Sequence, residues 1–156
     1  MQRWILWAAL AVVGLALIGG GGLYGYREFS QGKPANIWVP IPLNLETPLD
    51  EQENIASKID TELRKDEILK KVISDLGLVG KFGVSGEDAA LVELKKRLFV
   101  EVGLTETHVG PMPSINVGMK GTRREAELST EMTERVAKDV FRMIGIDPET
   151  GRPFGQ

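Results

Sequence analysis

The chain has 156 residues, 19 Lys or Arg against 22 Asp or Glu, a formal net charge of −3 and no cysteine. Without cysteine this sequence cannot form disulfides, a lipid-modified cysteine, covalently attached c-type haem or cysteine-ligated zinc and iron–sulfur centres. Its net acidity argues against nucleic-acid binding and against electrostatic attraction to anionic lipid. We therefore expect no cofactor and no nucleic-acid partner.

Residues 4–26 form 23 consecutive positions without a charged side chain. As a helix, at about 1.5 Å per residue, this segment is roughly 34 Å long, enough to cross the roughly 30 Å apolar layer of a bilayer. The pattern predicts one N-terminal transmembrane helix over residues 1–26. Aromatic residues lie at both of its ends, where such side chains typically meet lipid headgroups: Trp4, Trp7, Tyr24 and Tyr26.

A cleaved signal peptide is the alternative for this segment, with residues 4–18 as its apolar region and small residues at 19–22 for the peptidase. The uncharged run exceeds the roughly 7–15 residues usual for such a region, which favours an uncleaved signal-anchor. Flanking charges nearly tie, with Arg3 before the span and Arg27 and Lys33 after it. Because a long domain translocates largely regardless of such biases, we favour a single-pass protein of the bacterial inner membrane with a periplasmic C-terminal domain.

Small residues recur at four-residue spacing along the predicted span, at Ala16 with Gly20 and at Gly21 with Gly25. This spacing lets two helix backbones approach closely in lipid, although Gly and Ala are also simply common in spanning helices. The span contains no His, Asp, Glu, Lys or Arg, hence no usual axial haem ligand and no proton relay. We expect it to pack against the helices of other membrane-protein subunits.

The rest of the chain divides into a polar linker at residues 27–35, an extramembrane domain at 36–144 and a turn-like tail at 145–156. Apolar residues alternate with other residues from Ile37 to Leu45, which predicts a half-buried strand. The strand contains two prolines of the same parity, whose missing N–H groups share one edge. The strand should therefore lie at the edge of its sheet, with Pro40 and Pro42 facing outward.

Four amphipathic helices are predicted by apolar residues at three- and four-residue spacing. Thr47 caps the first helix before Pro48, while Thr122 and Glu125 form a capping box for the last, which runs to about Ile144. The two middle helices start at Asp66, with Gly77 as the stop signal, and at Ser85; residues 80–86 are predicted to be a loop.

Two further strands are predicted by alternation over residues 98–104 and 114–120. The Gly- and Pro-rich residues 105–111 between them contain the single histidine, His108, which we interpret as a solvated loop residue. The predicted fold is therefore α+β. It has one N-terminal transmembrane helix and a small mixed sheet of about three strands covered by about four helices.

Acidic side chains cluster at three places, but each cluster falls in a predicted first helical turn, where anions offset the helix dipole. The glycines of residues 80–86 lack the Gly-Lys-Ser/Thr ending of a phosphate loop and do not follow a strand. We therefore expect no enzymatic activity and no metal site. The clusters are Asp50, Glu51 and Glu53; Asp66 and Glu67; and Glu87 and Asp88.

The order of elements resembles the membrane-proximal α/β domain of chain-length determinant proteins, the Wzz-type polysaccharide co-polymerases. The resemblance covers roughly residues 36–144 and rests on hydrophobic patterns: residues 54–59, 68–78, 94–102 and 114–119, and a helix starting near Glu125 and Ala126. It implies a non-enzymatic periplasmic domain that oligomerises beside the inner membrane. The family's long helical extension and second span have no counterpart in this sequence.

Our leading hypothesis is a non-enzymatic accessory or scaffold subunit that docks onto a larger membrane complex and stabilises it. Its partners would be other membrane-protein subunits and the lipid bilayer. The complex could belong to polysaccharide assembly, respiration or photosynthesis. The alternative is a truncated chain-length regulator of O-antigen- or capsule-type polysaccharide synthesis.

Overall fold

The computed structural model describes residues 34–108 and 110–148. The predicted span and the linker up to residue 33 lie outside the described residues. Within the described ranges, no helix is both long and apolar enough to cross a membrane.

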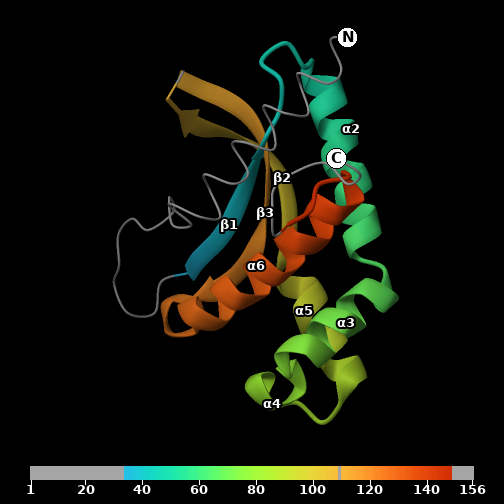
Figure 1. Cartoon of the computed structure of the whole chain (residues 1–156). Helices are drawn as coiled ribbons and strands as arrows, with labels where there is room; N and C mark the ends of the chain where they lie inside the picture. Colours follow the sequence, from blue (N-terminus) through green and yellow to red (C-terminus); the bar gives the residue numbers. More distant parts are fainter. Residues whose placement is uncertain (1–33, 109, 149–156) are drawn as a thin grey trace.

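The described residues form one three-stranded sheet and five α-helices, which confirms the α+β class (Figure 1). One helix was not predicted, α4, which begins at Leu78 and overlaps the first part of the expected loop at residues 80–86. In chain order the elements are β1 (Pro34–Pro42), α2 (Leu49–Leu63), α3 (Asp66–Leu76), α4 (Leu78–Phe82), α5 (Glu87–Arg97), β2 (Leu98–Thr107), β3 (Gly110–Thr122), the 3-10 turn η1 (Arg123–Glu125) and α6 (Ala126–Met143).

The sheet is wholly antiparallel, so the prediction of a mixed sheet is wrong. Its strand order is β1-β3-β2. The helices α2 to α5 carry the chain from β1 to β2, and these two strands run in the same direction. They do not touch as neighbours, because β3 lies between them and is antiparallel to both.

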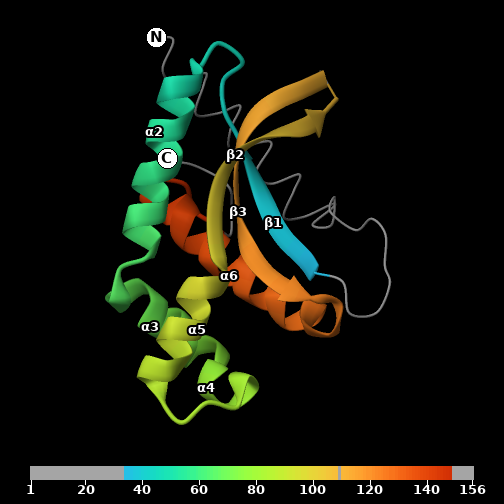
Figure 2. The same cartoon turned by 180° about the vertical axis from the view of Figure 1, so that it is seen from behind.

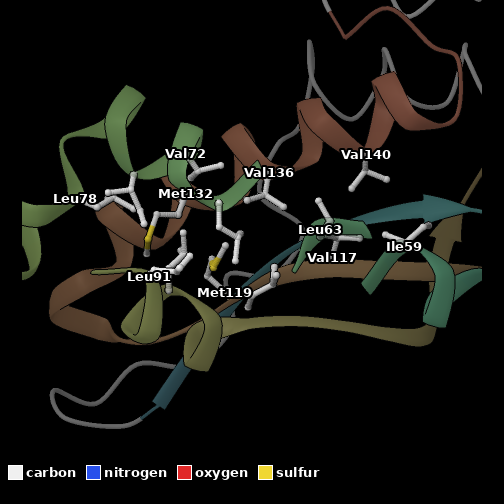
Figure 3. Close-up of a cluster of buried hydrophobic side chains, with 14 of the residues drawn as sticks. Ile59, Leu63, Val72, Leu78, Leu91, Val117, Met119, Met132, Val136 and Val140 are labelled. Atoms are coloured by element: carbon white, nitrogen blue, oxygen red, sulfur yellow. The ribbon is translucent and has the colours of Figure 1, made fainter. Parts of the chain in front are cut away.

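The helices cover one face of the sheet, as Figures 1 and 2 show from opposite sides. Alternate residues of β3, namely Ile115, Val117 and Met119, point to this face and are fully buried. They meet Leu63 of α2 and Val136 of α6 in one hydrophobic core (Figure 3). The pairing of apolar strand positions with helix stripes thus produces a two-layer domain.

The opposite sheet face, which we call the second face, has none of the described helices over it (Figure 2). Cross-strand register places its residues in rows. Trp38, Gly118 and Phe99 form one row. The neighbouring rows carry Pro40 from β1, Glu101 from β2 and Lys120 from β3.

The edge position predicted for the first strand is confirmed by the strand order, although β1 ends at Pro42 rather than at residue 45. The amide of Leu43 donates to the carbonyl of Pro113 at 2.7 Å, so odd-numbered amides face β3. The even-numbered prolines of β1 therefore face outward, and Pro34 adds a third to the two predicted. The missing donors protect this edge against pairing with another strand.

Hydrogen exchange should show this parity directly. We expect slow exchange at the amides of Val39 and Ile41, which face β3, and fast exchange at Trp38 and Asn44, which face solvent. Amide exchange measured residue by residue by NMR would check this. Equal protection at both parities would contradict the assigned edge.

Helix starts differ from the predicted caps in three of four cases. The N-cap positions of α2, α3 and α5 are Pro48, Lys65 and Gly86, and none makes a side-chain cap bond. Thr47 instead accepts a bond on its carbonyl from the Gln52 side chain at 2.7 Å. The Thr122–Glu125 capping box is present as predicted, and it opens η1 before α6. Gly77 ends α3 in the left-handed conformation, as its stop signal predicted.

Candidate interaction surface

The described residues contain no group of three or more His, Cys, Asp or Glu that could hold a metal ion. Apart from Glu53, which lies beyond the first turn of α2, the predicted acidic clusters do lie in first helical turns: Asp50 and Glu51 in α2, and the other pairs in α3 and α5. His108 is exposed in the turn between β2 and β3. These positions give each polar group a structural explanation.

A half-buried arginine, Arg97, contributes to the packing of the helices. Arg97 at the end of α5 bonds Glu93 at 3.0 Å and Glu125 of η1 at 2.9 Å, and its guanidinium lies 5.0 Å from the centre of the Phe82 ring. Burial alone lowers the pKa of Arg97, but hydrogen bonds to the two carboxylates outweigh burial and raise it. Arg97 therefore stays charged and fastens α5 to the start of α6.

The same contact acts on the partner carboxylate. The hydrogen bond from Arg97 holds the pKa of Glu125 below its usual range, with Thr122 contributing two further bonds. Because the pKa is lowered in the folded state, this stabilisation is present above the ordinary pKa of a glutamate. It is lost only as the pH falls through the lowered value. The capping box should thus persist in all but strongly acidic conditions.

Exposed apolar side chains gather at the end of the sheet remote from Pro34, which we call the distal end. Leu45 and Leu49 follow β1 into α2 and are 63% and 62% exposed. Leu104 of β2, 73% exposed, pairs with Pro113, the residue that accepts the Leu43 amide bond. Solvated side chains of this size favour contact with another apolar surface.

Acidic side chains accompany these leucines. Residues 46–53 contain no Lys or Arg, and every acidic residue among them is exposed. Another exposed carboxylate lies beyond Leu104 on β2, at Glu106. A surface with apolar centres and an acidic surround fits a partner whose apolar surface has a basic rim.

The sequence reasoning missed much of this end, because it interpreted residues 105–111 as a connecting loop. Both strands in fact extend into these residues: β2 ends at Thr107, β3 begins at Gly110, and these two residues pair. They form a hairpin arm that extends beyond the helices (Figures 1 and 2). One signal was available: Pro111 and Pro113 share a parity, as Pro40 and Pro42 do. Their N atoms face the β1 side of β3, where Pro113 lies opposite Leu43 and Pro111 lies beyond the last residue that pairs with β1.

The site residues predicted for the membrane lie outside the described residues. This applies to the small residues Ala16, Gly20, Gly21 and Gly25, and to the interfacial aromatic residues Trp4, Trp7, Tyr24 and Tyr26. Their packing and membrane roles stay predictions.

No protein-family model, no curated protein and no solved structure matches this chain. The resemblance to chain-length determinant proteins accordingly stays a prediction. The geometry of the described residues is therefore the basis for a functional proposal.

Proposed function

We propose that this protein is a non-enzymatic, single-span accessory subunit that docks onto a larger membrane protein complex and stabilises it. The observation that supports the proposal most directly is the apolar distal end, with Leu45, Leu49 and Leu104 exposed far from the start of β1. The span predicted at residues 4–26 would supply a second contact within the lipid.

The start of β1, which follows the predicted span and linker, lies well apart from the distal end. β1 has nine residues, so Pro34 and the distal end are separated by roughly 30 Å at about 3.3 Å per residue. A subunit bound through its span at one point and through its distal end at another would bridge two parts of a complex. Two linked contacts bind more tightly than either alone, because the second forms at high effective concentration.

Docking is expected to use surfaces of side chains rather than strand addition. Prolines block the outer edge of β1, and Pro111 lacks a donor on the edge of β3 that β1 leaves free in the hairpin arm. At the start of β2, the Arg64 side chain of α2 bonds the carbonyl of Leu98 at 3.0 Å. The leucines of the distal end are therefore better candidates than the edge of β1 or the start of β2.

Affinity purification of the full chain in mild detergent tests the proposal. We expect a membrane-protein partner in fixed stoichiometry with the wild type, and a several-fold loss of that partner from the double variant Leu45→Ser/Leu49→Ser. Val92→Ser on α5 is the matched control, because Val92 is 55% exposed but lies at the other end of the domain. It should retain the partner.

A further variant in the same purification tests the predicted span. Gly20→Ile keeps the segment apolar but blocks close helix approach, and should weaken association by roughly 1–2 kcal/mol. Full recovery of the partner with all these variants would overturn docking through either contact. A homo-oligomer that recovers only a polysaccharide polymerase would instead support the chain-length regulator.

A further inference from the structure

The outer edge of β2 differs from the other free edges of the sheet. Prolines remove outward donors from β1 and, at Pro111, from the free part of β3. β2 ends the strand order, so its outer edge has no neighbouring strand among the described residues. Its ten residues include no proline, lysine or arginine. An edge without these residues leaves its backbone groups available to another strand.

The register identifies the residues whose backbone groups face this edge. Odd-numbered residues of β3 face β1, as the bond from Leu43 to Pro113 shows, so the even-numbered ones face β2. These pair with odd-numbered residues of β2, and the even-numbered residues of β2 therefore direct their N–H and C=O groups outward. The first of them is Leu98, whose carbonyl accepts the bond from Arg64. The outward groups beyond it belong to Val100, Val102, Leu104 and Glu106.

This segment of β2 can pair with a copy of itself. Because it is centred on Gly103, antiparallel pairing places Val102 opposite Leu104 of the second copy, and each facing pair exchanges two hydrogen bonds. A register centred on Val102 would extend the pairing to the Leu98 carbonyl, which Arg64 already holds. The free backbone groups thus favour the register centred on Gly103.

The side chains of the strand fit the same register. On the second face, Glu101 lies opposite Thr105 of the second copy, and on the helix side Glu106 lies opposite Val100. No glutamate faces another glutamate, an arrangement that would destabilise the pair. Leu104 is 73% exposed in the single chain, and Val102 of the second copy would pack beside it.

We propose that two copies of this chain associate through the outer edges of β2, antiparallel and centred on Gly103, so that their sheets join into one. A two-fold axis, the commonest symmetry of homo-oligomers, relates the copies. The inference goes beyond the proposed function and needs neither the predicted span nor a docked partner. The paired strands include Leu104 of the distal end but neither Leu45 nor Leu49.

Disulfide cross-linking tests the register, because the chain has no cysteine of its own. The double variant Glu101→Cys/Thr105→Cys places two thiols at facing positions that exchange no hydrogen bond across the interface. Their Cα atoms would be about 4.5 Å apart, within the range of about 4.4–6.8 Å that disulfides span. Within one strand the two positions are roughly 13 Å apart, so they cannot bridge inside a single chain.

We expect the double variant, purified as the full chain in mild detergent and mildly oxidised, to form a cross-linked dimer on a non-reducing gel. The single variants Glu101→Cys and Thr105→Cys are the matched controls. In each, the two identical thiols would lie roughly 13 Å apart across the axis and should cross-link several-fold less. A double variant that stays monomeric, or single variants that cross-link as well as the double one, would overturn the proposal.

A proline at the edge provides an independent measurement. Val102→Pro removes a donor that faces outward, so it should lower the dimer fraction several-fold in analytical ultracentrifugation while the sheet stays intact. Asn36→Pro removes an outward donor from β1 instead and should leave the dimer unchanged. Far-UV circular dichroism checks that both variants remain folded. A folded Val102→Pro chain that dimerises like the wild type would contradict pairing at this edge, whereas recovery of a membrane-protein partner by the monomer would leave the proposed function standing.

Discussion

Replacing Gly118 with alanine is expected to destabilise the domain by about 3 kcal/mol, a value at the upper end for overpacking. A Cβ at this position would lie 2.7 Å from the Trp38 Cα and closer still to the Ile37 carbonyl oxygen. Both obstacles are backbone atoms of β1, so no side-chain rotation can relieve the clash. The strand would have to move away from β3 and give up part of its pairing.

Gly103→Ala is the matched control. Its Cβ would meet the side-chain amide of the buried Asn116, which can turn away only by giving up the hydrogen bond that it accepts from Ser114. Neither glycine has a positive φ, so alanine strains the backbone at neither position. We expect about 1 kcal/mol at Gly103, the usual contribution of one hydrogen bond. Urea unfolding followed by circular dichroism measures both. Similar values for the two variants would show that β1 does not approach β3 as closely as the structure has it.

Hydrophobic periodicity was sufficient to predict most of the elements. The stripe of Ile59 and Leu63 predicted α2, and that of Met132, Val136 and Val140 predicted α6, because burial on one helix face imposes the 3.6-residue period. The alternation of residues along β1 was equally informative. Because Pro40 and Pro42 share a parity, the sequence predicted that β1 is an edge strand. These features are local, and a local pattern is sufficient to define them.

The features that the sequence did not predict depend on tertiary contacts. Helix α4 lies among glycines that suggest a loop, and its first residue, Leu78, is fully buried in the core. The hairpin arm was missed because Gly110, Pro111 and Pro113 are ordinary turn residues. Only the position of β1 shows that Pro111 occupies an outward-facing edge. The antiparallel sheet likewise depends on β3 inserting between two strands that precede it in sequence.

The candidate interaction surface also has features that the sequence predicts and features that depend on the fold. The acidic residues of α2 were visible in sequence, but the position of Leu104 at the same end of the domain depends on a hairpin that sequence reasoning did not predict. Single exposed leucines are unremarkable in any sequence, and only the fold places Leu45, Leu49 and Leu104 at one end. The second face was likewise hidden, because strand alternation does not tell which face the helices will cover.

Leu63→Ala and Leu49→Ala make the same chemical change at the two ends of α2, and we expect very different results. Leu63 is fully buried between the sheet and α6 (Figure 3). Its truncation should cost about 2–5 kcal/mol, through lost burial and the cavity left behind. Leu49 is 62% exposed, so its truncation should change the free energy of unfolding by less than about 0.5 kcal/mol.

The contrast bears on function because the two leucines have different roles. Urea unfolding of the two variants measures stability, and the affinity purification described above measures docking. Leu49→Ala should lower recovery of the partner while the domain stays as stable as the wild type, which a residue of the core cannot do. A loss of stability at Leu49 comparable with that at Leu63 would show that Leu49 belongs to the core. Its exposure would then no longer support a docking surface at the distal end.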